Sequence, residues 1–278
     1  MTARETDFLP IRAVIFDMDG LLINSEDIIS QATNCLLEKY ARPPLTPSMR
    51  AQLMGVAGST NSDMFHTWAQ LPISRDDWRQ ELGEEMRRGF QNCEPLSGAE
   101  ALLLELSRSV NSQTGDQIQL ALASNTKTAS FSLKISRPET RALLNNFKSE
   151  RRILGDDKRL REGRSKPAPD IYLVALEALN STRLPGSSAI LARDCLVVED
   201  SIAGVEAGRR AGMRVVWVPH PLLVAEYQPR EKEILAGRMG RTAIGDEWQL
   251  GQIDDGWAER ISNLESFNYK KYGIRVLT

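Results

Sequence analysis

Short runs of apolar residues mark the places along the chain where buried β-strands are expected. Four runs cover residues 12–17, 118–124, 195–200 and 213–219, and their interiors are almost continuous in Val, Ile, Leu and Ala. Strands without polar alternation are typical of a parallel sheet that is covered on both faces. A weaker strand is expected within residues 147–155.

Segments with helical periodicity lie between the predicted strands. They cover residues 98–110, 126–136, 169–180 and 201–211. Gly212 follows the last of them directly, at the position where helices commonly end in a glycine. The alternation of strand and helix predicts an α/β fold with a doubly wound parallel sheet.

The first two predicted strands are too far apart in the chain for a single crossover helix. About 100 residues separate Asp17 from Ser124, whereas a connecting loop and helix need about 25. Helical patterns fill this stretch, and prolines separate the first pattern from the second. The patterns cover residues 26–40, 47–54 and 76–90.

The sequence therefore predicts two modules and a less regular tail. Residues 25–93 are expected to form an inserted helical cap, and residues 1–24 and 94–220 the α/β core. Residues 221–278 are expected to extend from the core and pack on it, partly as loop. The loop is expected at residues 237–256, which are rich in Gly and charge.

Composition narrows the range of partners. The chain has 278 residues, of which 41% are hydrophobic and 26% charged, and its formal net charge of -2 favours neither nucleic acid nor a membrane surface. No apolar run approaches the roughly 20 residues of a membrane span. The polar first ten residues are unlike a secretory leader, and the three scattered cysteines suit a reducing compartment. We expect a cytoplasmic monomer or weak homodimer that binds no nucleic acid and no membrane.

Two carboxylates follow the first predicted strand. Asp17, Met18, Asp19 and Gly20 come directly after the apolar residues 14–16. Carboxylates at the end of a buried strand are costly unless a positive group neutralises them, and a hard divalent cation does this well. Gly20 permits the sharp turn that follows. The same four residues are also compatible with a turn that has no catalytic role.

Three further signals follow later strands. Ser124 and Asn125 precede a helix start, whose free N–H groups favour anions. Lys166 stands beside prolines before another helix, where it is suited to neutralise a phosphate. Glu199 and Asp200 end the third apolar run, and Asp200 suits a metal ligand. Each signal alone has a structural explanation: a helix cap, a solvated lysine or an acidic helix start.

All four signals lie at or just past the carboxyl ends of predicted strands, or in the loop after one. Open α/β sheets bind their ligands at this edge. Several acidic groups, a hydroxyl and a lysine are therefore expected to converge on one crevice.

In this order the motifs resemble those of the haloacid dehalogenase superfamily. The resemblance covers residues 11–220 and rests on residues 17–20, Ser124, Lys166 and residues 199–200. The longer stretches FDMDGLLINSE and LVVEDSIAGVEAGRRAGMRVVWVP are similar to the branch with a helical cap after the first motif. That branch includes pseudouridine-5′-phosphatases, β-phosphoglucomutases and small sugar-phosphate phosphatases.

The resemblance implies a Rossmann-like core and a role for each matched residue. Asp17 would attack phosphorus and form an aspartyl-phosphate, and Asp19 would protonate the leaving oxygen and then activate water. Lys166 and Ser124 would hold the transferring phosphoryl oxygens. Further phosphate contacts are expected from Asn125 and Gly20. The implied cofactor is Mg²⁺, held by Asp17, the main-chain carbonyl of Asp19, Asp200 and, directly or through water, Glu199.

The resemblance leaves the substrate and two alternatives open. The expected reaction is hydrolysis of a small soluble phosphate monoester, nucleotide-like or a sugar phosphate, with pseudouridine 5′-phosphate among the candidates. A β-phosphoglucomutase-type mutase would carry a histidine shortly after the first motif, where this chain has Ile29. A non-catalytic binding protein of the same fold would lack the nucleophile or the metal-binding acid. Asn24 stands where members of the superfamily that this chain resembles usually have an aspartate.

Overall fold

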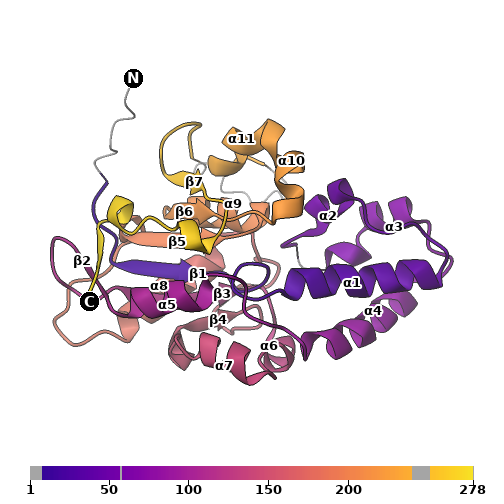
Figure 1. Cartoon of the computed structure of the whole chain (residues 1–278), viewed down its shortest axis with the longest axis horizontal. Helices are drawn as coiled ribbons and strands as arrows, with labels where there is room; N and C mark the ends of the chain where they lie inside the picture. Colours follow the sequence, from indigo (N-terminus) through magenta and orange to yellow (C-terminus); the bar gives the residue numbers. More distant parts are fainter. Residues whose placement is uncertain (1–7, 57, 240–250, 278) are drawn as a thin grey trace.

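A parallel β-sheet forms the centre of the molecule (Figure 1). The computed structural model describes residues 8–56, 58–239 and 251–277. Within these residues, six strands form one parallel sheet in the order β4-β3-β1-β5-β6-β7. They are β1 (Ala13–Phe16), β3 (Gln119–Ser124), β4 (Arg152–Leu154), β5 (Cys195–Glu199), β6 (Arg214–Trp217) and β7 (Ala258–Arg260).

Both faces of this sheet are covered, as the continuous apolar runs predicted. Val14 and Phe16 of β1 pack into one core, whereas Ala13 and Ile15 pack into the other. The helices α5 (Ala99–Ser107), α6 (Thr128–Lys134) and α7 (Pro138–Leu144) contribute to the first core, and α8 (Asp170–Ser181) and α9 (Ile202–Arg210) to the second. The predicted doubly wound α/β fold is confirmed.

Most predicted elements of the core are confirmed, one local prediction is wrong and one helix was missed. Gly212 ends α9 with a φ of 71°, as expected. The last residues of the helix predicted over 98–110 belong instead to β2 (Ser109–Asn111), because β8 (Ile274–Val276) pairs with it antiparallel. The helix α7 was not predicted.

Four helices follow β1 and form a helical module with its own apolar core. They are α1 (Ser25–Lys39), α2 (Pro47–Leu53), α3 (Asp63–Ala69) and α4 (Arg75–Phe90). The fully buried side chains of Leu37, Phe65 and Trp78 lie at its centre. Figure 1 shows this module beyond the carboxyl end of β1. The helix α3 was not predicted, and the cap bounds at residues 25 and 93 stay a prediction.

The tail contributes to the core. After α10 (Val224–Tyr227) and α11 (Glu231–Leu235), β7 extends the sheet and β8 pairs with β2. The loop predicted over residues 237–256 falls partly on residues 240–250, outside the described residues. Short 3-10 helices complete the described chain: η1 (Ser59–Asn61), η2 (Ser149–Arg151), η3 (Ala192–Asp194), η4 (Pro221–Leu223), η5 (Gln228–Arg230), η7 (Leu264–Ser266) and η8 (Lys270–Tyr272). Every described helix falls short of the length and apolarity that crossing a membrane requires.

Candidate active site

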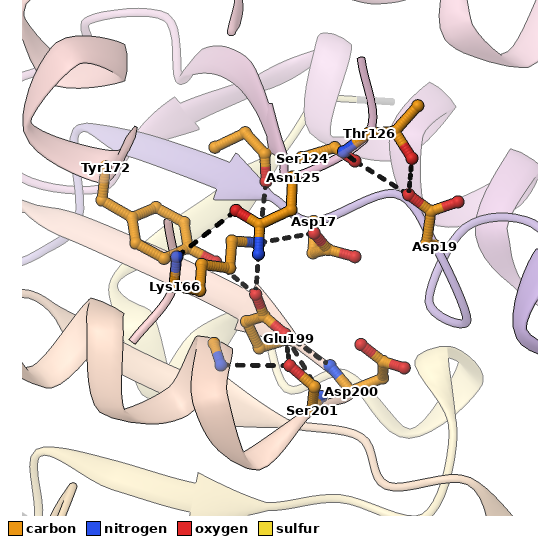
Figure 2. A network of polar contacts seen from close by, with 12 residues as sticks. Asp17, Asp19, Ser124, Asn125, Thr126, Lys166, Tyr172, Glu199, Asp200 and Ser201 are labelled. Carbon is orange, nitrogen blue, oxygen red and sulfur yellow. Dashed lines mark hydrogen bonds and ion pairs between the residues drawn. The ribbon is translucent and has the colours of Figure 1, made fainter. Parts of the chain in front are cut away.

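Segments that are far apart in the sequence meet at the carboxyl edge of the sheet (Figure 2). The strand β1 lies between β3 and β5, with Phe16 in register with Leu122 and Val198. Asp17 follows β1, and its backbone N–H donates to the carbonyl oxygen of Val198 over 3.0 Å. The parallel register therefore brings Asp17 beside the ends of both neighbouring strands, as the motif positions predicted.

Lys166 lies between Asp17, which follows β1, and Glu199, the last residue of β5. Its side chain is buried, and its Nζ atom lies 2.5 Å from Asp17 Oδ1, 2.6 Å from Glu199 Oε1 and 2.9 Å from the carbonyl oxygen of Ala123. Burial alone would lower the pKa of Lys166, but the charges of Asp17 and Glu199 raise it. The lysine is therefore a fixed cation inside the site, as predicted, and not a solvated surface lysine.

Glu199 is fully engaged by hydrogen bonds. Its Oε1 accepts from Lys166 and, over 2.5 Å, from the hydroxyl of Tyr172. Its Oε2 accepts from the backbone N–H groups of Asp200 and Ser201 over 3.1 and 3.2 Å, at the start of α9. In this arrangement Glu199 fixes the positions of Lys166 and of the residues that begin α9.

The acids at the strand ends fit a divalent cation. Oxygen atoms of Asp17, Glu199 and Asp200 lie within 4.8 Å of one another. Asp200 Oδ2 is buried and has no hydrogen-bond partner. Burial and the charge of Glu199 raise the pKa of Asp17 to about 8, against the opposing charge of Lys166, and raise the pKa of Asp200 well above its usual value. Clustered carboxylate oxygens, one of them without a hydrogen-bond partner, are a ligand set that suits a hard ion.

Asp19 points away from Asp17, toward the end of β3 (Figure 2). Its carboxylate accepts hydrogen bonds from four side chains: Ser25 Oγ at 2.6 Å, Ser124 Oγ at 2.8 Å, Thr126 Oγ1 at 2.7 Å and Lys134 Nζ. Burial would raise the pKa of Asp19, but Lys134 and the hydroxyl donors lower it to about 2. In this conformation Asp19 is an ionised acceptor, so it must leave these partners before it can act as a general acid.

Two residues predicted to bind phosphate, Ser124 and Asn125, differ in whether they have a free hydrogen-bond donor. Ser124 is fully buried, and its hydroxyl is already used between Asp19 and the backbone N–H of Thr126. Asn125 accepts from the N–H of Lys166 through Oδ1, whereas its Nδ2 is buried and has no partner. Asn125 Nδ2 is therefore a free donor beside the acids.

Gly20 leaves room for the carboxylate of Asp200. Its φ is 76°, and a Cβ atom at this position would lie 2.3 Å from Asp200 Oδ2. Its backbone N–H donates to the carbonyl oxygen of Ile23 over 2.9 Å, so this group is engaged. A side chain here would collide with the acid that the cation site depends on.

A cavity of about 220 Å³ opens between these residues and the helical module. Asp17, Asn125, Lys166 and Asp200 line one end, and residues of α1, α2, α4 and the turn after α2 line much of the rest. The turn after α2 packs directly on the site, because a Cβ atom on Gly55 would lie 2.3 Å from Ser201 Cβ. Sequence reasoning missed several charged or hydroxyl-bearing residues of this site: Glu26, Arg50, Thr126, Lys134 and Tyr172.

The fold and the site together define an α/β enzyme with an acidic, cation-fitting pocket at the strand ends, suited to binding a phosphoryl group. The model of the family described as haloacid dehalogenase-like hydrolase matches residues 14–218. The chain belongs to this family, and the predicted membership is confirmed.

Individual relatives agree with this assignment. A Saccharomyces cerevisiae protein named "Probable pseudouridine-5'-phosphatase" is 31% identical and covers 95% of this chain and 98% of its own. An Arabidopsis thaliana (DL)-glycerol-3-phosphatase is 29% identical over 88% of this chain and 76% of its own. A Deinococcus radiodurans family hydrolase, crystallised with phosphate and sodium, shares the fold at 24% identity with a TM-score of 0.57, covering 76% of this chain and 82% of that one. The predicted enzyme class, a hydrolase with phosphatase relatives, is confirmed.

Proposed function

We propose that this chain is a Mg²⁺-dependent phosphatase that hydrolyses a small phosphate monoester through an aspartyl-phosphate on Asp17. The observation that carries the proposal is the convergence of Asp17, Lys166 and Asp200 with two buried atoms that lack partners. Asp200 Oδ2 is an acceptor suited to a cation, and Asn125 Nδ2 is a donor suited to a phosphoryl oxygen. The phosphatase names of the relatives support the same reaction class.

The chain's own residues account for both steps of the reaction. Asp19 first leaves its hydrogen-bond partners and takes up a proton from solvent. An Asp17 oxygen then attacks phosphorus while the bond to the leaving oxygen breaks, and Asp19 transfers its proton to that oxygen. Water then attacks the phosphorus, Asp19 takes its proton, and the bond to Asp17 breaks to release phosphate. Lys166 and Asn125 hold the phosphoryl oxygens throughout.

Asp17, Asp200 and the main-chain carbonyl of Asp19 would hold Mg²⁺, with Glu199 in support. The ion would neutralise charge on the phosphoryl group when bound. The helical module is expected to act as a cap that excludes water and selects the leaving group. The cytoplasmic location and the monomeric or weakly dimeric state remain predictions.

Asp17→Asn tests the proposal. We expect turnover of 4-nitrophenyl phosphate with Mg²⁺ to fall at least about 1,000-fold, because the amide is a poor nucleophile, while the circular dichroism spectrum is retained. Asp76→Asn, which changes an exposed acid on α4, is the matched control and should keep full turnover. Retained activity in Asp17→Asn would contradict the proposal.

The two alternatives give different outcomes in the same assays. A mutase would release little phosphate and would isomerise a sugar phosphate when a bisphosphate activator is present. A non-catalytic binding protein would turn over no ester, with or without Mg²⁺. A panel containing pseudouridine 5′-phosphate, nucleoside monophosphates, and hexose and polyol phosphates separates these cases.

A further inference from the structure

Arg50 is a cation in the cavity wall that the proposed chemistry does not use. It lies on α2 and lines the same cavity as Asp17 and Lys166, and its side chain is 14% exposed. One terminal nitrogen pairs with Asp27 Oδ1 over 2.6 Å, whereas its Nε is buried without a partner. Because a guanidinium has five N–H donors, Arg50 keeps hydrogen-bonding capacity for a ligand.

The orientation of Arg50 is fixed by Asp27. Asp27 lies on α1 and also accepts from His220 Nε2, over 3.1 Å, in the loop after β6. His220 Nδ1 accepts from the N–H of Leu222, so its ring proton is on Nε2. Asp27 is thereby held between the core and the helical module, and it holds the guanidinium against the cavity.

Glu26 supplies an acceptor on the same wall. It lines the cavity one residue before Asp27, and its carboxyl group accepts from the backbone N–H of Gly55. Arg50 and Glu26 therefore present donors and an acceptor to the same space. A hydroxyl group both donates and accepts, so it is the group that such a pair matches best.

Other leaving groups fit this wall less well. A second phosphate would have to compete with Asp27, which already pairs with the guanidinium of Arg50, and would lie close to the carboxyl group of Glu26. A nucleobase usually stacks on aromatic side chains, and none of the described residues that line the cavity is aromatic. The volume of about 220 Å³ is also below the roughly 300 Å³ at which pockets for drug-sized ligands begin.

We propose that Arg50 and Glu26 recognise the leaving group, and that the substrate is the phosphate ester of a small, non-aromatic polyol whose hydroxyl group they bind. This inference rests on the proposed phosphatase function. Apolar side chains that line the same cavity, from Ile29, Leu45, Leu53, Val56 and Met86, leave room for the carbon chain of the ester.

The test compares polyol esters with an ester whose leaving group carries an aromatic base and with an aryl ester that lacks a polyol hydroxyl group. We expect the wild-type enzyme to have a higher kcat/KM for glycerol 3-phosphate or ribitol 5-phosphate than for pseudouridine 5′-phosphate. Arg50→Met should lower kcat/KM for the polyol ester about tenfold more than for 4-nitrophenyl phosphate, mainly through KM. Arg50→Lys keeps the positive charge that pairs with Asp27 but loses the forked guanidinium group. It should therefore show the same change in the ratio of kcat/KM between the two esters, in a fully folded protein.

Arg79→Met is the matched control, because Arg79 is an exposed arginine on α4. It should leave the ratio between the two esters unchanged. The inference is overturned if both Arg50 variants lower turnover of the two esters equally, or if pseudouridine 5′-phosphate is preferred about tenfold over the polyol esters. If the wild type turns over none of these esters, 4-nitrophenyl phosphate included, the proposed function itself is refuted.

Discussion

Two carboxyl groups of this site have pKa values that are shifted in opposite directions. Burial would raise the pKa of Asp19, but Lys134 and two hydroxyl groups lower it to about 2. The pKa of Glu26 is raised to about 7, because burial and the charge of Asp19 outweigh the attraction of Lys134 and Arg50. Burial and neighbouring charge together therefore set the proton affinity of each carboxyl group.

Glu26→Gln should make the protein's stability less dependent on pH. A raised pKa means that the folded state binds the Glu26 proton more tightly than the unfolded chain, so the wild type loses stability as pH rises from 4.5 to about 7. The free energy of unfolding of Glu26→Gln relative to wild type should therefore increase by about 2 to 3 kcal/mol between pH 4.5 and 8. Urea unfolding at several pH values, in chelator, measures this difference.

Glu100→Gln is the control for this measurement, because Glu100 is an exposed glutamate on α5. Its stability should follow the wild-type pH curve. If Glu26→Gln follows the same curve, Glu26 does not carry a buried proton in the folded protein.

At the scale of elements, the contact between α9 and the end of β5 leaves no room for a side chain. Gly204 lies in the first turn of α9, and a Cβ atom there would lie 1.8 Å from the Glu199 carboxyl carbon. Glu199 cannot yield easily, because Lys166 and Tyr172 both hold its Oε1. The glycine therefore sets how closely α9 approaches the site.

Gly204→Ala should destabilise the protein by about 3 kcal/mol and lower Mg²⁺-dependent turnover, because either α9 or Glu199 must move. Gly83→Ala is the matched control, since Gly83 also lies inside a helix and its nearest neighbour would be the flexible end of Arg87 at 3.6 Å. That change should stabilise the protein by about 0.5 to 1 kcal/mol. Thermal and urea unfolding of both variants measure the contrast, and equal stability of Gly204→Ala and wild type would show that the contact is not tight.

At the scale of the whole molecule, the tail completes a core that begins at the other end of the chain. Leu264, Phe267, Tyr272 and Ile274 are buried in the same cluster as Phe16. These residues lie beyond the stretch that the family model matches. The folded unit therefore extends past the shared family region.

Phe267→Ala should cost about 3 to 4 kcal/mol, because it removes a buried aromatic ring from this shared core. Ile253→Ala, in the same tail but 49% exposed, should change stability by less than about 0.5 kcal/mol. Denaturant unfolding of the two variants checks this, and a small effect of Phe267→Ala would mean that the tail is an appendage and not part of the core.

The sequence alone was enough to predict five of the six described strands of the sheet, most of the helices and where the acids at the strand ends would meet. Buried parallel strands are short and continuous in apolar residues, so they can be recognised locally. Because parallel strands all end at the same edge, Asp17 and Asp200 were expected to be neighbours before any contact was known. Family membership followed from the same motifs.

Contacts between distant side chains could not be predicted in this way. The rotation of Asp19 away from Asp17 depends on Lys134 and Thr126, and the position of Arg50 depends on Asp27 and His220. No periodicity or motif marks these partners, because each contact forms only when separate elements pack together. The direction of a side chain and its charge are properties of its folded surroundings, so they had to come from the three-dimensional arrangement.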